Sequence, residues 1–118
     1  MSKKVLVLED EPYYQEIYRS EIGQHFTLEF ADNGEQGLEI VKKQQFDVIL
    51  VDLIMPIMSG IRFLEELQKL NLQHKPRIIV LTTLDGMTDR EDCFARGADE
   101  FIVKSETTPD ELVEVINE

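Results

Sequence analysis

Four short apolar runs that lack polar alternation constrain the fold of this chain more than any other feature. They occupy residues 5–8, 48–51, 78–81 and 101–103. Strands buried on both faces of a parallel sheet have such uninterrupted runs, whereas a half-exposed strand alternates. Residues 27–30 do alternate, and they predict a fifth strand at an edge of the sheet.

Apolar residues at helical spacing follow each of the five predicted strands. The apolar positions of the five helices are Tyr14, Ile17, Tyr18 and Ile22; Leu38 and Val41; Ile61, Leu64 and Leu67; Cys93, Phe94 and Gly97; and Leu112, Val115 and Ile116. Pro12 and Pro109 stand at expected first turns, and Thr107 or Thr108 is placed to cap the last helix. Five strand–helix repeats predict an α/β fold, a doubly wound parallel sheet with helices on both faces.

Length, charge and cysteine content narrow the class of protein. The 118 residues suit one domain over residues 1–118, and the net charge of −12 argues against this domain binding nucleic acid or an anionic membrane. We see no signal peptide or transmembrane segment, and the single Cys93 fits a reducing compartment, so we expect a cytoplasmic protein. The chain stops at Glu118 without a capping glycine, so the last helix could be cut short and an output domain could follow.

Polar residues follow four of the five predicted strands. They are Glu9, Asp10 and Glu11 after the first strand, Asp52 after the third, Thr82 and Thr83 after the fourth, and Lys104 after the last. In open α/β sheets, functional groups collect at the carboxyl ends of the strands, near the point where the strand order reverses. We therefore expect acids, a hydroxyl and an ammonium group to meet at one edge of the sheet.

These groups together indicate phosphoryl chemistry. Carboxylates at Glu9, Asp10 and Asp52 would repel one another, so a cation is expected among them, and hard oxygen ligands favour Mg²⁺ or Mn²⁺. A carboxylate beside such a metal can attack phosphorus and form an aspartyl phosphate. The Lys104 ammonium can neutralise one phosphoryl oxygen and the Thr82 hydroxyl can donate to another.

Four segments carry a resemblance to a known family. Residues 8–12, 51–60, 80–83 and 97–104 resemble, in order and spacing, the receiver domains of two-component response regulators, including the chemotaxis regulators. The resemblance covers nearly the whole chain and implies the flavodoxin-like (βα)5 fold with strand order 2-1-3-4-5. It implies phosphoryl transfer from a histidine kinase or histidine phosphotransfer protein. It also implies that helix 4, strand 5 and helix 5 form a face that switches to control a partner or output domain.

The resemblance assigns roles to individual residues. The implied phosphoacceptor is Asp52, and the implied metal ligands are Glu9, Asp10, Asp52 and the backbone carbonyl of Ile54. The implied partners of the phosphoryl group are Thr82 and Lys104, and the implied switch residues are Thr82 and Phe101. The alternatives are that Thr82 is a plain loop hydroxyl and that Phe101 is a plain core residue.

Some positions depart from the family pattern. Glu9 stands where Asp is commoner, and its longer side chain could hold a metal through water. Ser59 replaces a frequent Asp, and Thr83 stands where a small residue is usual. Ser105 stands where Pro usually follows the lysine, so we expect a trans peptide between Lys104 and Ser105, because a non-proline cis bond is costly.

Three other functions compete with this interpretation. A phosphohydrolase of the haloacid dehalogenase type needs a second acid two residues after the nucleophile, and Ile54 cannot serve as one. A flavin carrier needs a phosphate-binding loop after the first strand, and the acids at 9–11 would repel a phosphate. In a phosphorylation-independent interaction module we would expect some of the pocket's acids, its hydroxyl or its lysine to be replaced. Here all of these residue types are present. We therefore expect a signalling phosphoacceptor and not an enzyme.

Two aliphatic residues bear on how long the phosphoryl group would last. Ile54 and Leu84 lie two residues after the phosphoacceptor and two after the switch threonine, near the expected approach of a hydrolytic water. Neither side chain can accept a proton or orient the water, so we expect a long-lived phosphorylated form unless both side chains point away.

Overall fold

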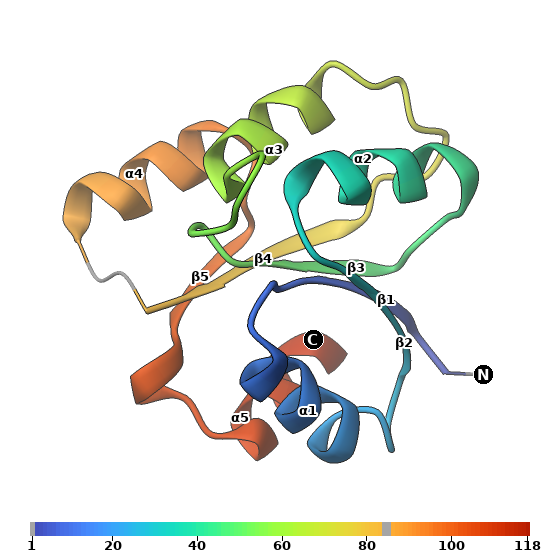
Figure 1. The fold of residues 1–118 in the computed structure, drawn as a ribbon, viewed down its shortest axis with the longest axis vertical. Coiled ribbons are helices and arrows are strands. Elements are labelled where there is room, and N and C mark those ends of the chain that lie inside the picture. The colour runs from blue at the N-terminus through green and yellow to red at the C-terminus, as the bar shows by residue number, and fades with distance from the viewer. Residues whose placement is uncertain (1, 84–85) are drawn as a thin grey trace.

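The computed structural model of the chain describes residues 2–83 and 86–118. Its elements are β1 (Lys4–Leu8), α1 (Pro12–Glu21), β2 (Thr27–Ala31), α2 (Gly34–Lys43), β3 (Val48–Val51), α3 (Gly60–Gln68), β4 (Arg77–Thr82), α4 (Met87–Ala95), β5 (Glu100–Val103), the 3-10 turn η1 (Lys104–Glu106) and α5 (Pro109–Asn117). The five strands are parallel and lie in the order β2-β1-β3-β4-β5 (Figure 1). The predicted flavodoxin-like fold and strand order are confirmed. No helix in the described ranges is long and apolar enough to cross a membrane.

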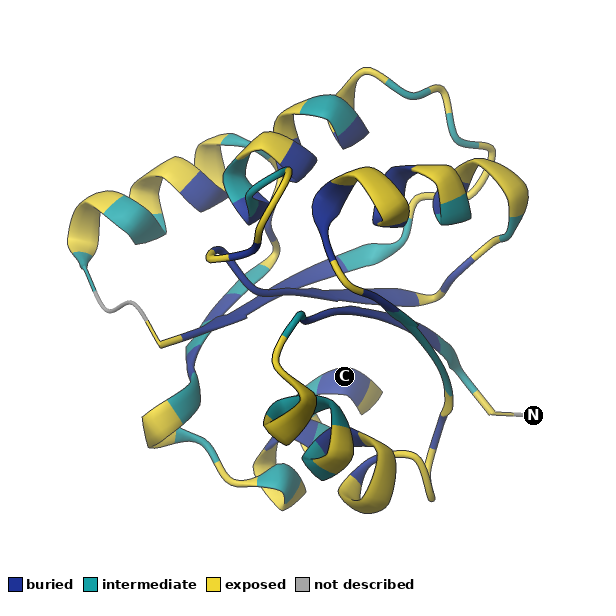
Figure 2. Cartoon of the chain, viewed as in Figure 1, coloured by how far each residue is buried: buried dark blue, intermediate teal, exposed yellow. Residues whose placement is uncertain are grey.

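The sheet separates two apolar cores. Helices α1 and α5 cover one face, and α2, α3 and α4 cover the other (Figure 1). Strand β3 contributes side chains to both cores, because alternate residues of a strand point to opposite faces. Leu50 packs against α1 and α5, and Val51 packs in the core covered by α2, α3 and α4. Figure 2 shows the buried strands between helices whose outer surfaces are exposed. Burial on both faces explains the uninterrupted apolar runs of the central strands.

The two edge strands differ from the central ones. β2 is an edge strand, as its alternation predicts, and most of its residues are partly exposed. Residues 101–103 were expected to be buried on both faces, which is wrong for Ile102, because β5 forms the other edge and leaves this side chain half-buried.

Side-chain caps fix where several helices begin. The Thr108 hydroxyl accepts a hydrogen bond from the Glu111 N–H at 3.2 Å, and the Glu111 carboxylate accepts one from the Thr108 N–H, so Thr108 and not Thr107 is the cap. Ser59 caps α3 by accepting from the N–H of Arg62 at 3.3 Å. Pro12 and Pro109 occupy first turns as predicted. No cis peptide bond occurs in the described ranges, so the bond between Lys104 and Ser105 is trans, as expected.

The apolar pattern predicted for the fourth helix is partly wrong. Cys93 is fully buried, but Phe94 is half-exposed, and Gly97 lies beyond the helix with φ +96°. This left-handed conformation ends the helix and turns the chain toward β5, a geometry that glycine adopts at little cost. Gly97 is therefore a helix terminator and not part of a core-facing stripe.

Candidate metal and phosphoacceptor site

The parallel strands bring the predicted site residues to one edge of the sheet. Glu9 follows β1, Asp52 follows β3, Thr82 ends β4 and Lys104 follows β5. The register aligns these ends, since Leu8 pairs with Val51 and Thr82 pairs with Val103. Residues far apart in the sequence therefore lie side by side where the strands end (Figure 1).

Three carboxylates form a compact cluster at this edge. Glu9, Asp10 and Asp52 each offer an oxygen, and these oxygens lie within 4.8 Å of one another. Glu9 and Asp52 are buried, whereas Asp10 is half-buried. Close carboxylate oxygens with partial access to water fit Mg²⁺, which prefers hard oxygen ligands and keeps several waters. The donor set therefore fits the metal that the sequence implied.

The side chain of Lys104 already places a positive charge beside two of these acids. Its Nζ lies 2.5 Å from Oε1 of Glu9 and 3.1 Å from Oδ2 of Asp52. All three side chains are less than a tenth exposed, so water screens these contacts little. The ammonium also lies 3.9 Å from the centre of the Tyr14 ring, a cation–π contact. Lys104 thus partly supplies the cation that the acids require.

Burial and pairing act in opposite directions on this ion pair. Burial raises the pKa of Glu9 above its ordinary value, and this outweighs the hydrogen bonds that Glu9 accepts from Lys104 and from the Glu11 N–H. Burial by itself would lower the pKa of Lys104, but the hydrogen bond to Glu9 and the charge of Asp52 outweigh it, so this pKa is raised. Lys104 therefore stays charged at neutral pH, and Glu9 takes up a proton more readily than an exposed glutamate.

The remaining predicted residues are Thr82, Phe101, Ile54 and Leu84. Thr82 is fully buried at the end of β4, and Phe101 is also buried. The Ile54 N–H lies 3.4 Å from Oδ1 of Asp52, and its side chain is exposed. The Ile54 carbonyl as a metal ligand stays a prediction. Leu84 lies outside the described residues.

The sequence interpretation missed two residues of α1 that support the site. Tyr14 contacts the Lys104 ammonium, and the Gln15 side-chain amide donates to the Glu9 carbonyl at 2.5 Å and to Asp32 at 3.1 Å. Both residues follow Asp10 by about one helical turn. This spacing could have predicted that their side chains lie near the acids.

The loop after Asp52 contains a strained residue. Ile57 has φ +67° and is strongly exposed. A β-branched residue in the left-handed region is a genuine outlier, because its Cβ crowds the backbone there. The loop after the phosphoacceptor candidate therefore holds Ile57 in a conformation that this residue type does not favour.

The fold and the site together define a doubly wound α/β domain with an acidic cluster at the carboxyl ends of its strands. The family model described as the response regulator receiver domain matches residues 5–117. The chain therefore belongs to the response regulator receiver domain family and is a receiver domain of two-component signalling. Receiver domains bind Mg²⁺ at an acidic site, and the acidic cluster found here is consistent with this.

Similar proteins include kinases and regulators. Hybrid signal transduction histidine kinase K of Dictyostelium discoideum is 34% identical over 111 residues, which cover 86% of this chain and 9% of the kinase. Transcriptional regulatory protein SrrA of Staphylococcus aureus is 31% identical over 106 residues, covering 88% of this chain and 42% of SrrA. The structure of chemotaxis protein CheY4 of Vibrio cholerae has a TM-score of 0.90 at 25% identity, covering 99% of this chain and 98% of that one. The chain thus spans less than half the length of these two curated relatives.

Proposed function

We propose that this receiver domain accepts a phosphoryl group on Asp52 from a histidine kinase or histidine phosphotransfer protein, in a reaction that depends on Mg²⁺. The observation that carries the proposal is the cluster of Glu9, Asp10 and Asp52 oxygens within 4.8 Å, with the Lys104 ammonium bonded to two of these acids. The phosphoryl group would then alter the face formed by α4, β5 and α5 and so control a partner.

The transfer exchanges one bond to phosphorus for another. An Asp52 carboxylate oxygen attacks the phosphorus of a phosphohistidine, an O–P bond forms, and the N–P bond breaks with its electron pair returning to the imidazole nitrogen. Such transfer needs positioning and charge neutralisation more than covalent assistance. Bound Mg²⁺, or Mn²⁺, held by Glu9, Asp10, Asp52 and the Ile54 carbonyl would neutralise carboxylate and phosphoryl oxygens.

The protein's own groups supply the remaining stabilisation. The Lys104 ammonium lies 3.1 Å from Oδ2 of Asp52 and so places a positive charge beside the attacking carboxylate. In the phosphorylated form this ammonium would exchange a carboxylate oxygen for a phosphoryl oxygen. Thr82 ends the neighbouring strand β4, and its hydroxyl would donate a hydrogen bond to a second phosphoryl oxygen.

The proposal extends to the role of the chain in the cell. It would act in the cytoplasm as a signalling acceptor that catalyses only its own phosphorylation and dephosphorylation. Its target would be an output domain joined beyond Glu118 or a separate effector. The net charge of −12 supports a protein target over direct binding to nucleic acid or a membrane.

Intact-mass spectrometry tests the central claim. Incubation with Mg²⁺ and acetyl phosphate should add one phosphoryl mass to the wild type, and chelation of the metal should prevent it. Asp52→Asn should gain none, whereas Asp110→Asn, which removes an exposed acid at the start of α5, should behave as the wild type. An unmodified wild type, or equal adducts in the wild type and Asp52→Asn, would show that the proposal is wrong.

A further inference from the structure

Helix α4 is held to the domain by little apolar burial. Cys93 is its only buried residue, while Met87 is largely exposed and Phe94 is half-exposed. Burial of an apolar face normally supplies most of the stability of a packed helix. The position of α4 therefore depends on the polar contacts that it makes with its neighbours.

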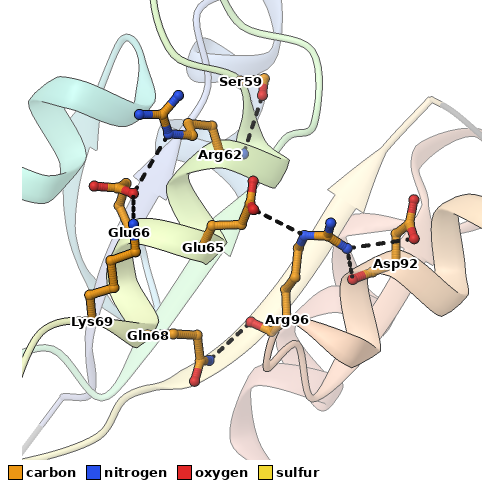
Figure 3. A network of polar contacts seen from close by, with 8 residues as sticks. All are labelled: Ser59, Arg62, Glu65, Glu66, Gln68, Lys69, Asp92 and Arg96. Carbon is orange, nitrogen blue, oxygen red and sulfur yellow. Dashed lines mark hydrogen bonds and ion pairs between the residues drawn. The ribbon is translucent and has the colours of Figure 1, made fainter.

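One set of polar contacts fixes the carboxyl-terminal end of α4 to α3 (Figure 3). The Gln68 side-chain amide donates to the Arg96 carbonyl at 2.9 Å, and Oε2 of Glu65 lies 3.8 Å from Nε of Arg96. Arg96 also donates to the Asp92 carbonyl at 3.1 Å, which closes the last turn of the helix. These contacts concentrate at one end of α4 and make that end a natural pivot.

A second contact joins α4 to β5 nearer the amino-terminal end of the helix. The Arg90 guanidinium carbon lies 4.8 Å from the centre of the Phe101 ring. Arg90 is half-buried and Phe101 is buried, so the contact is partly shielded from water. Cation–π attraction strengthens as the pair is desolvated. Arg90 precedes Arg96 by six residues, which is about 9 Å along a helix.

The Phe101 ring lies on the same face of the sheet as Thr82. Phe101 pairs with Val80 in the register of β4 and β5, and Thr82 follows Val80 by two residues. Alternate residues of a strand share a face, so Thr82, Val80 and Phe101 lie on the side that α4 covers. A rearrangement at Thr82 would therefore change the packing around the Phe101 ring.

We propose that Arg90 is the positioning residue that ties α4 to the Phe101 ring, so that the ring and the helix move together about the Arg96 end. A phenylalanine ring has no hydroxyl with which to hold one of two positions. The guanidinium over its face supplies the directional contact that the ring lacks. This inference rests on the proposed phosphoryl switch and names the contact that would transmit it to α4.

Beryllofluoride, whose fluorines stand in for phosphoryl oxygens, provides the test with Mg²⁺ present. We compare wild type, Arg90→Met, Arg90→Lys and the control Arg62→Met, which removes an exposed arginine of α3. Amide and phenylalanine ring NMR signals are followed during titration. The cation–π contact should change the balance between two arrangements by about 2- to 30-fold. In wild type and Arg62→Met, signals of residues 87–95 should shift in concert with the Phe101 ring.

Arg90→Met should still shift around Asp52, but its α4 signals should no longer follow the ring, and Arg90→Lys should restore part of the response. Equal responses in wild type and Arg90→Met would overturn the inference, as would an Arg90→Lys response no better than that of Arg90→Met. A loss as large in Arg62→Met would overturn it too. If the wild type gave no shift around Asp52 with beryllofluoride, the proposed function itself would fail, and the inference with it. Circular dichroism establishes that each variant is folded.

Discussion

Replacing Lys104 with methionine should expose how much the site depends on its internal cation. The substitution keeps an unbranched apolar side chain but removes the ammonium that lies 2.5 Å from Glu9 and 3.1 Å from Asp52. Both carboxylates are buried, so neither can recover full hydration. The metal-free variant would therefore hold two acids close together without a counter-charge.

The contact geometry sets the expected size of the loss. At an effective dielectric constant of about 20, each contact is worth roughly 5–7 kcal/mol of Coulomb energy before desolvation is counted. The variant no longer has to desolvate an ammonium group, and the net cost of breaking a buried pair by removing one partner is about 3–5 kcal/mol. For a domain of this length, this corresponds to a fall in Tm of about 12–20 °C.

The loss should depend on pH in a defined direction. A raised pKa in a buried acid means that the folded state holds its proton more tightly than the unfolded state, so the acid destabilises the fold as pH rises above about 4.5. Without Lys104 this penalty grows, so the deficit should be largest at pH 7–8 and shrink toward pH 4.5. In the wild type, the raised pKa of Lys104 means that its stabilisation persists below pH 10.5 and is lost only above it.

Urea unfolding in chelator at several pH values measures these free energies directly. Lys43→Met is the matched control, because Lys43 is exposed on α2 and its loss should change stability by less than about 0.5 kcal/mol. Added Mg²⁺ should recover more stability in Lys104→Met than in the wild type, since the metal would replace the missing charge. A deficit below about 1 kcal/mol at pH 7.5, or one that grows as pH falls, would refute the reasoning.

Four further outcomes are expected. Ile57→Gly should raise the free energy of unfolding by about 1 kcal/mol in urea titrations, because glycine relieves the strain at φ +67°; a loss of stability would contradict the strain. Thr108→Ala should lower the free energy of unfolding by about 1 kcal/mol by removing the cap of α5, and Thr108→Ser should restore it. Asp10→Asn should reduce the rise in Tm that millimolar Mg²⁺ causes, and an undiminished rise would exclude Asp10 as a ligand. Ile54→Asn should shorten the lifetime of the phosphorylated form, measured by intact mass over time, because an amide can orient the hydrolytic water; an unchanged lifetime would show that Ile54 does not hinder it.

The features that sequence predicted well are those in which one physical requirement dominates. Residues 48–51 were predicted as a strand with the bounds that the structure has, because burial on both faces leaves only apolar side chains. A threonine cap of α5 was predicted at Thr107 or Thr108, and the structure places it at Thr108. Glu9, Asp52 and Lys104 were expected together because parallel strands bring their carboxyl ends to one edge.

The features that sequence did not predict depend on tertiary packing. Lys104 pairs with both Glu9 and Asp52 because its long side chain points between them. No local sequence pattern encodes that direction. The stacking of Arg90 on Phe101 depends on how α4 packs against β5. Ile57 contradicts its own local preference, since a β-branched residue rarely has positive φ and only the surrounding loop imposes it.

The ion pair at the site joins the first, third and last strands of the domain. Lys104 is 95 residues from Glu9 and 52 from Asp52, and each of these residues stands at the end of a different strand. A chain still emerging from the ribosome has no assembled site until β5 has been released and has docked beside β4. Under the proposed function, only a chain that has finished folding could therefore accept a phosphoryl group. Partly synthesised or locally unfolded copies would not take phosphoryl groups from the donor.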